Sequence, residues 1–281
     1  MRELNGIDEV RECVRRLRAR HGAVGFVPTM GNLHQGHIAL VEYAHRRCPV
    51  VVASIYVNPL QFGENEDFSN YPRTLDRDRQ TLRAAGANVL FLPDEAVMYP
   101  RGTGQQTRVV VPGLADILDG EFRPGHFEGV TTVVARLLNI VGPDVAVFGR
   151  KDYQQLVIIK RMVADLAMAV EIEGMETTRA DDGLALSSRN QYLTGEERAV
   201  APGLYAVLED CAQQVRAGAD IDQTCRRGLE QLKEMGFRPD YLEVRRQSDL
   251  LRPADGDDEL VVLAAARLGR ARLIDNLEFQ R

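Results

Sequence analysis

In the first 176 residues, short apolar runs alternate with segments in which apolar residues recur at helical spacing. The runs are typical of buried strands, and the helical spacing is typical of amphipathic helices. The predicted strands cover residues 24–27, 50–57, 89–92, 145–148 and 170–172, and Pro28 is expected to end the first of them. The predicted helices cover residues 7–17, 36–44, 75–85, 130–141 and 153–166, and Thr74 is the candidate cap of the third. Strands that alternate with helices predict a parallel sheet with helices on both faces, which is a Rossmann-like doubly wound α/β fold.

The pattern changes near residue 176. Two long helical patterns follow, at 196–217 and 221–235, and three strand-like runs, at 241–244, 260–265 and 272–274, fit a small antiparallel sheet. We therefore expect two domains, residues 1–176 with the parallel sheet and a smaller α+β domain of residues 177–281. Parallel sheets of this kind bind ligands at the carboxyl ends of their strands, so the first domain is the expected place for a ligand.

The composition is that of a globular protein. Of the 281 residues, 44% are hydrophobic and 27% are charged. The formal net charge of −6 disfavours a general nucleic-acid-binding surface, and no apolar run approaches the roughly 20 residues that span a membrane. The cysteines, Cys13, Cys48, Cys211 and Cys225, form no C-x-x-C pair, and no signal-like segment follows Met1. These features predict a cytoplasmic protein with reduced thiols.

Residues 31–37, GNLHQGH, place two histidines and two glycines between a predicted strand and a predicted helix. A metal site needs further ligands, and His21, His45 and His126 have no recognised zinc spacing to the pair. Histidines that only hydrogen-bond the backbone of a loop are the plain alternative. A phosphate site explains more residues together, because glycines admit a nucleotide, a helix N-terminus attracts an anion and imidazole N–H groups donate to phosphoryl oxygens. The stretch PTMGNLHQGH resembles the H-x-G-H signature of adenylyl-transferring folds.

Two further segments offer donors for ATP, whose phosphates need cations and Mg²⁺ as charge builds on the leaving pyrophosphate. Residues 149–152, GRKD, follow the predicted strand 145–148 and place Lys151 at the carboxyl edge of the sheet. Residues 186–189, LSSR, offer two hydroxyls and a guanidinium, which suit a loop that closes over phosphates. A surface lysine and a serine pair in a turn are the plain alternatives when each segment is taken alone.

Ordered blocks along nearly the whole chain, taken together, resemble the pantothenate synthetase family, ligases that join pantoate to β-alanine at the expense of ATP. The blocks are VPTMGNLHQGH, YVNPLQF, NYPRTLDRD, RPGHFEGVTTVVARLLNIVGPDVAVFGRKDYQQL, DGLALSSRNQYL and RLIDN. The resemblance implies that the carboxylate of (R)-pantoate attacks the α-phosphate of ATP to form pantoyl adenylate and pyrophosphate, and that β-alanine then releases AMP and pantothenate. It also implies a homodimer. Mg²⁺ is the cofactor expected with the triphosphate of ATP, and the smaller C-terminal domain is expected to act as a lid over it.

The resemblance implies the site residues as well. His34, His37 and Lys151 are the expected catalytic residues. Gln61 and Gln155 are the expected pantoate-binding residues, and Gln61 is also expected to face β-alanine. The expected ATP-binding residues are Met30, Gly31, Asn32, Leu33, His34, Gln35, Gly36, His37, Gly149, Arg150, Lys151, Asp152, Thr178, Leu186, Ser187, Ser188 and Arg189. No direct metal ligand is expected, and Asp78 is the candidate outer-shell partner of Mg²⁺ through water.

Three positions depart from the family pattern: Leu186 replaces a methionine, Arg150 a glutamate and Glu128 a basic residue. The leucine keeps volume and apolarity, whereas the two charge changes alter the expected electrostatics beside the site. Thr178, where valine is common, is expected to contact adenine through its backbone. Pro28 and Met30 are expected to form an apolar wall for the methyl groups of pantoate.

Other roles and functions are open on the residues alone. Asn58, Tyr71, Arg123 and His126 lie in family-like blocks, where lining the site and fixing loops are equal alternatives. A related nucleotidyltransferase would need a second basic cluster for an acceptor phosphate, and the pantoate-side blocks offer mostly glutamines and apolar residues. A nucleotide-sensing module with a decayed site would have lost some of the polar groups that are all present here.

Overall fold

The computed structural model describes residues 1–63, 66 and 68–281. The chain divides into two compact units, Met1–Arg150 with Ile158–Glu176, and Lys151–Val157 with Thr177–Arg281. The second unit thus includes residues 151–157, which the sequence pattern had grouped with the first domain. The assignment of substrate binding to one domain and of closure to the other stays a prediction.

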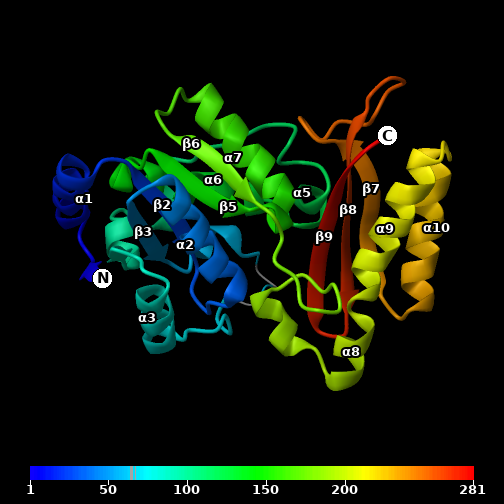
Figure 1. The fold of residues 1–281 in the computed structure, drawn as a ribbon, viewed down its shortest axis with the longest axis horizontal. Coiled ribbons are helices and arrows are strands. Elements are labelled where there is room, and N and C mark those ends of the chain that lie inside the picture. The colour runs from blue at the N-terminus through cyan, green and yellow to red at the C-terminus, as the bar shows by residue number, and fades with distance from the viewer. Residues whose placement is uncertain (64–65, 67) are drawn as a thin grey trace. The chain divides into compact units, whose positions relative to one another are not determined.

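The first unit is built on a six-stranded sheet in which every neighbouring pair is parallel. The order is β1-β4-β3-β2-β5-β6 (Figure 1), with β1 (Arg2–Leu4), β2 (Val24–Thr29), β3 (Val50–Ile55), β4 (Val89–Phe91), β5 (Val145–Gly149) and β6 (Glu171–Met175). From β2 the chain continues to β3 on one side, and from β5 it continues to β6 on the other. The loops after β2 and β5 therefore lie at the switch point where open α/β sheets bind ligands.

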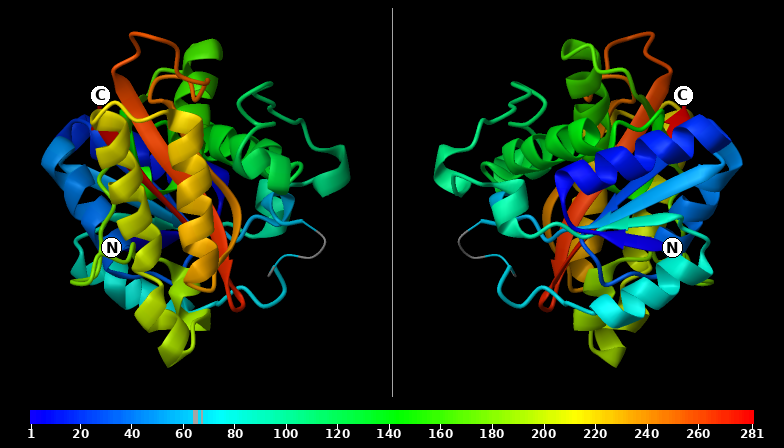
Figure 2. Two further views of the ribbon diagram at one scale, coloured as in Figure 1. Left: turned by 90° about the vertical axis from the view of Figure 1, so that its right-hand side faces the viewer. Right: turned by 90° about the vertical axis from the view of Figure 1, so that its left-hand side faces the viewer.

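Helices cover both faces of this sheet (Figures 1 and 2), which confirms the predicted doubly wound fold. The helices and 3₁₀ turns are α1 (Ile7–His21), α2 (Gln35–Arg47), η1 (Pro59–Gln61), α3 (Leu75–Ala84), α4 (Glu95–Met98), η2 (Thr103–Gln105), α5 (Asp119–Phe122), α6 (His126–Val141), η3 (Arg150–Asp152) and α7 (Tyr153–Asp165). On one face, Val41 and Ala44 of α2 and Leu82 of α3 pack into a core with the sheet. On the other face, α1 packs against α6.

One local prediction about the first unit was wrong, and a second is confirmed only in part. Pro28 does not end β2, because its register with β3 continues to Thr29, opposite Ile55. Pairing of β2 with β5 covers only residues 25 and 26, so the missing N–H of Pro28 removes no bond on that side. Thr74 occupies the N-cap position of α3 but makes no capping bond with its side chain, and its hydroxyl donates to Asp78 instead.

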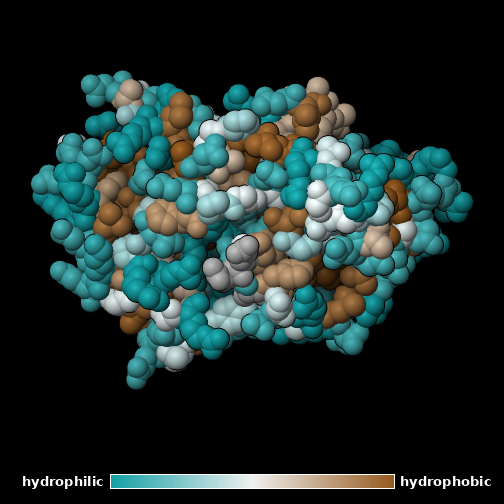
Figure 3. Space-filling view, turned by 180° about the vertical axis from the view of Figure 1, so that it is seen from behind, coloured by the Kyte–Doolittle hydropathy of each residue, from teal (hydrophilic) through white to brown (hydrophobic). Residues whose placement is uncertain are grey.

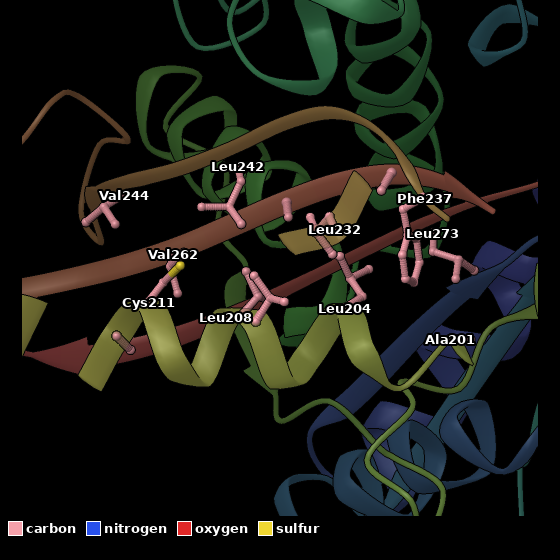
Figure 4. Packing of buried hydrophobic residues seen from close by; sticks show 14 of the residues in the cluster. Ala201, Leu204, Leu208, Cys211, Leu232, Phe237, Leu242, Val244, Val262 and Leu273 are labelled. Carbon is pink, nitrogen blue, oxygen red and sulfur yellow. The ribbon is translucent and has the colours of Figure 1, made fainter. Parts of the chain in front are cut away.

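The second unit contains a three-stranded antiparallel sheet, as predicted, and helices that cover one of its faces (Figures 1 and 2). Its elements are η4 (Ser188–Tyr192), α8 (Gly195–Val200), α9 (Gly203–Arg216), α10 (Ile221–Glu234), β7 (Arg238–Arg246), β8 (Glu259–Leu268) and β9 (Ala271–Gln280). Leu204 and Leu208 of α9 point toward the sheet (Figure 4), and they belong to one buried core with Leu242 and Val262 of its strands.

The long helix predicted for residues 196–217 is two helices. Pro202 lies between α8 and α9, and it has no N–H with which to continue the hydrogen-bond ladder of a helix. The helical spacing of apolar residues on either side of a proline concealed this interruption.

In the part of the chain that the structure describes, the surface shows no large hydrophobic area on the face drawn in Figure 3, where hydrophilic and hydrophobic residues are interspersed. No helix among the described residues is long and apolar enough to cross a membrane. All four cysteines are free, and burial raises the pKa of Cys211 to about 12 and that of Cys225 to about 11, which keeps both thiols protonated.

Candidate active site

The loop after β2 makes a left-handed turn before α2 begins. Gly31 has a φ of 81° and Asn32 a φ of 49°, a region that glycine and asparagine adopt more readily than other residues. A Cβ on Gly31 would also lie 3.1 Å from Oδ2 of Asp78 and 3.2 Å from Cγ2 of Ile55. The glycine that the sequence motif requires is therefore needed for both its conformation and its small size.

A buried carboxylate holds this turn. Asp78, on α3, has 1% of its surface exposed, and its two oxygens accept from the backbone N–H groups of Asn32 and Leu33, both at 2.9 Å. The hydroxyl of Thr74 donates to the same carboxylate at 3.1 Å. These bonds give Asp78 a part in shaping the loop, whereas its suggested contact with Mg²⁺ through water stays a prediction. The sequence indicated Asp78 only as a member of the NYPRTLDRD block, because its partners lie 45 and 46 residues away.

The two histidines cap α2 reciprocally. His34 is the N-cap residue and its Nδ1 accepts from the N–H of Gly36 at 3.2 Å, while Nδ1 of His37 accepts from the N–H of His34 at 3.2 Å. A ring nitrogen that accepts carries no proton, so each neutral imidazole has its proton on Nε2. The ring centroids are 4.2 Å apart. Two N–H donors are thereby combined with the positive end of the helix dipole, an arrangement suited to a phosphate.

The orientation of the Gln61 side chain is set by a chain of bonds from backbone groups. Oδ1 of Asn58 accepts from the N–H of Leu60 at 3.3 Å and from the hydroxyl of Tyr99 at 2.7 Å. Nδ2 of Asn58 donates to the carbonyl of Gly129 and to Oε1 of Gln61, both at 3.1 Å. Because the amide oxygen of Gln61 is used in this way, its Nε2 group lies near Sδ of Met30, at 3.1 Å, and presents N–H donors.

The backbone of Gln61 is held from the other side by His126 and Arg123. Nδ1 of His126 lies 2.8 Å from the carbonyl oxygen of Gln61, and Nε2 lies 2.9 Å from Nη1 of Arg123. A carbonyl only accepts and a guanidinium only donates, so His126 is neutral with its proton on Nδ1. Arg123 also forms an ion pair with Glu66 at 2.6 Å. These contacts support the loop-fixing alternative for Arg123 and His126.

This environment predicts a pH-dependent stability. Burial lowers the pKa of His126 from 6.5 to about 4, and the positive charge of Arg123 adds to the effect. Below pH 6.5 the unfolded chain therefore takes up a proton that the folded chain does not bind until about pH 4, so stability is lost as the pH falls through this window. We expect the free energy of unfolding to drop by on the order of 1–3 kcal/mol more in the wild type than in His126→Gln. Urea unfolding at several pH values measures this, and equal slopes for the two proteins would contradict it.

The residues after β5 belong to both units. Gly149 ends the strand, and Nε of Arg150 donates to the carbonyl of Gly174 on β6 at 3.1 Å. In the second unit, Lys151 is half-buried and Asp152 is exposed. The carbonyl of Lys151 accepts from Nδ2 of Asn276 at 2.8 Å. Arg150 therefore supports the sheet, and an additional role toward ATP stays a prediction.

The segment with the serine pair is the arm of a short hairpin in the second unit. The N–H of Leu186 donates to the carbonyl of Thr178 at 2.9 Å, and an isolated bridge pairs Arg179 with Ala185. Ser187 then caps η4, with its Oγ accepting from the N–H of Arg189 at 3.2 Å. Contact of Thr178 with adenine and of the serines with phosphate stays a prediction.

The structure thus distributes the expected site residues between the two units. The first unit holds residues 30–37, Gln61, Asp78, Gly149 and Arg150, and the second holds Lys151, Asp152, Gln155, Thr178 and residues 186–189. Of the two charge departures, Glu128 forms a partly exposed ion pair with Arg108 at 3.5 Å. The sequence did not indicate the bond between Tyr99 and Asn58, because the tyrosine lies outside every recognised block.

Comparison with known proteins identifies the family of the chain. The model of the family described as Pantoate-beta-alanine ligase matches residues 2–278. The chain belongs to the pantoate–β-alanine ligase family. This confirms the resemblance carried by the sequence blocks.

Individual members of the pantoate–β-alanine ligase family match over the whole chain. A pantothenate synthetase of Shewanella oneidensis is 55% identical over 275 residues, 98% of each chain. The crystal structure of pantothenate synthetase from Thermus thermophilus has 48% identity, a TM-score of 0.93 and full coverage of both chains. The ligase of Francisella tularensis, crystallised with beta-gamma ATP and β-alanine, has 33% identity and a TM-score of 0.82, with 99% and 97% coverage.

Proposed function

We propose that this chain condenses (R)-pantoate with β-alanine to give pantothenate, with ATP cleaved to AMP and pyrophosphate through a pantoyl-adenylate intermediate. Membership of the pantoate–β-alanine ligase family supports the overall reaction. The reciprocal cap of His34 and His37 is the observation that carries the chemistry, because it presents two N–H donors at the start of α2, after the switch-point strand β2. The relative from Francisella tularensis binds both a form of ATP and β-alanine.

In the first step a carboxylate oxygen of pantoate attacks the α-phosphorus, and the bond from that phosphorus to the bridging oxygen of pyrophosphate breaks. We assign His34 and His37 to donate Nε2–H to the phosphoryl oxygens, where negative charge builds in the transition state. Lys151 neutralises charge and orients the attacking carboxylate. Residues 30–37, 149–152 and 186–189, together with Thr178, are the proposed ATP-binding residues.

In the second step the amine of β-alanine attacks the acyl carbon of pantoyl adenylate. The bond from that carbon to the oxygen of AMP breaks, and the nitrogen loses a proton as the amide forms. Gln61 and Gln155 are assigned to the hydroxyl and carboxylate oxygens of pantoate. The amide orientation of Gln61 supports this, because its N–H donors match acceptors on the substrate.

Mg²⁺ is proposed to accompany ATP. Among the residues that the structure describes, no group of three or more histidine, cysteine, aspartate or glutamate side chains is arranged to hold a metal ion. We propose that the phosphates of the nucleotide supply most of the oxygen ligands of the ion. Bound in this way, Mg²⁺ would offset the charge of the leaving pyrophosphate.

The remaining proposals concern the setting of the reaction. Residues 1–176 are proposed as the ATP- and pantoate-binding domain and residues 177–281 as a lid that excludes water from the labile adenylate. We also propose a homodimer that works in the cytoplasm, as the family resemblance implies, with neither nucleic acid nor membrane as partner.

Transfer of oxygen from the acid to AMP tests the proposed reaction. Pantoate labelled with oxygen-18 in its carboxylate is incubated with the protein, ATP, Mg²⁺ and β-alanine, and the AMP is analysed by mass spectrometry. We expect one labelled oxygen in each AMP and one pantothenate for each AMP, with turnover abolished by chelation of Mg²⁺. Unlabelled AMP, or no AMP when all substrates are present, would rule the proposal out.

A further inference from the structure

The block RLIDN places two buried polar residues side by side on β9. Asp275 has 4% and Asn276 has 6% of its surface exposed. Neighbouring residues of a strand point to opposite faces, so the two side chains leave the sheet in opposite directions. The paired positions on β8 are apolar, Ala264 and Leu263. Ala264 belongs to the hydrophobic core of this unit, so an apolar residue at position 275 would have extended that core. Both buried polar side chains therefore need another explanation.

Asp275 faces the side of α9 and binds Arg179. Nη1 of the arginine donates to Oδ2 at 2.6 Å and Nη2 donates to Oδ1 at 2.9 Å, which is a bidentate pair. The guanidinium carbon lies 3.4 Å from the ring centroid of Tyr205 on α9. Arg179 is thereby held between a carboxylate and an aromatic ring, with few rotamers left to it.

Arg179 in turn fixes the hairpin that carries the serine pair. Its Nη1 donates to the carbonyl of Gly183 in the hairpin turn at 3.0 Å, and its backbone pairs with Ala185. Nδ2 of Asn190 donates to the carbonyl of Ala185 at 3.0 Å, which fixes the chain on the C-terminal side of the serine pair. Ser187 lies between these anchors, so its backbone position depends on the pair of Arg179 and Asp275.

Asn276 faces the other side of the sheet and binds the Lys151 turn. Its Nδ2 donates to the carbonyl of Lys151 at 2.8 Å. Two residues along the same face, Glu278 lies 3.1 Å from the hydroxyl of Tyr153, which also lies 3.2 Å from the carbonyl of Gln247. The turn η3 and the start of α7 are therefore docked on β9 at two successive positions of one face.

We infer that Asp275 and Asn276 are positioning residues that hold the Lys151 turn and the 178–190 hairpin in a fixed relation to each other within the second unit. Adjacent residues of one strand cannot move independently, so a single element of β9 sets the places of a cation and of a hydroxyl pair. Buried ion pairs and amides seldom raise stability much but can select one arrangement. The inference rests on the proposed function, which assigns Lys151 and residues 186–189 to ATP.

The rates of the two half-reactions, measured separately, distinguish a positioning role from a general loss of structure. In Asn276→Asp, which keeps the shape but removes the donor to the carbonyl of Lys151, we expect pantoate-dependent exchange of pyrophosphate into ATP to fall by about 10-fold or more. The reaction of supplied pantoyl adenylate with β-alanine involves no triphosphate, and it should stay within about twofold of the wild type. Asn276→Ala and Asp275→Asn should show the same split. A thermal melt confirms that each variant is folded, and only folded variants are compared.

A double-mutant cycle tests whether Asn276 acts through Lys151. In a Lys151→Ala background, Asn276→Asp should change the exchange rate by less than about twofold, because the side chain that it positions is gone. The matched control is Asp240→Asn, which removes an aspartate paired with Arg272 at 2.7 Å in the same sheet and should affect neither half-reaction.

The outcomes distinguish this inference from the proposed function. Three results would overturn the inference while the ligase activity remains. They are a wild-type rate of pyrophosphate exchange in the folded Asn276 and Asp275 variants, an equal fall in the rates of both half-reactions, and an undiminished effect of Asn276→Asp on the exchange rate in the Lys151→Ala background. Failure of the wild-type protein to form pantothenate would instead refute the proposed function.

Discussion

Replacing His37 by alanine is expected to slow the formation of pantoyl adenylate by about 10² to 10³-fold, the typical cost of removing one preorganised donor from a charged transition state. The structure gives a specific reason for so large an effect. Nδ1 of His37 accepts from the N–H of His34, so the proton of His37 is on Nε2, and the loss of this ring also leaves the N–H of His34 without its acceptor. The measurement is pyrophosphate exchange in the presence of saturating pantoate.

Two variants sharpen this experiment. His37→Asn keeps an amide that can accept from His34 and donate to a phosphate, so it should recover part of the rate. The matched control is His45→Ala, near the other end of α2. Nε2 of His45 lies 3.0 Å from the carbonyl oxygen of Gly86, and this histidine has no proposed contact with substrate. A His37→Ala enzyme that is folded and as fast as the control would remove the histidine from the mechanism.

The elements that the sequence predicted well are those specified by local periodicity. The helix predicted from apolar residues at 7–17 is α1, and the apolar runs at 24, 50, 89 and 145 are the starts of β2 to β5. β1 was missed because its strand Arg2–Leu4 has only one apolar residue, and its pairing with β4 is a tertiary contact. Pro28 was misjudged for a related reason, since a proline is tolerated where the neighbouring strand has already diverged.

The residues of the candidate site also fall into two groups, those that a local motif identifies and those that depend on tertiary contacts. His34 and His37 were found because the start of a helix, two glycines and both histidines lie within one short motif. The reciprocal bonds of the two histidines are also local. The supports of the site come from far along the chain, as with Gly129, which binds Asn58, and Asn276, which binds Lys151. A sequence pattern can identify such polar residues as unusual, but only the fold identifies their partners.

Asp78 is the clearest of these distant supports, and its replacement by asparagine is expected to cost both stability and activity. The buried carboxylate receives the N–H groups of Asn32 and Leu33 on separate oxygens. In Asp78→Asn one oxygen becomes an NH₂ group, which faces an N–H donor and leaves it unsatisfied. We expect the free energy of unfolding to fall by about 2–3 kcal/mol, the usual cost of a buried unpaired donor beside a lost charge-assisted bond.

The same substitution should lower the rate of pantoyl-adenylate formation by about 10²-fold, because the left-handed turn at Gly31 and Asn32 sets where α2 presents its two histidines. Urea unfolding and pyrophosphate exchange measure the two effects. The matched control is Asp76→Asn on the same helix, where the aspartate side chain is 92% exposed and pairs only with Arg79 in the part of the chain that the structure describes. That change should alter the free energy of unfolding by no more than about 0.5 kcal/mol. If Asp78→Asn behaved like Asp76→Asn, the turn would keep its shape without the carboxylate, and the histidine cap alone would have to organise the loop.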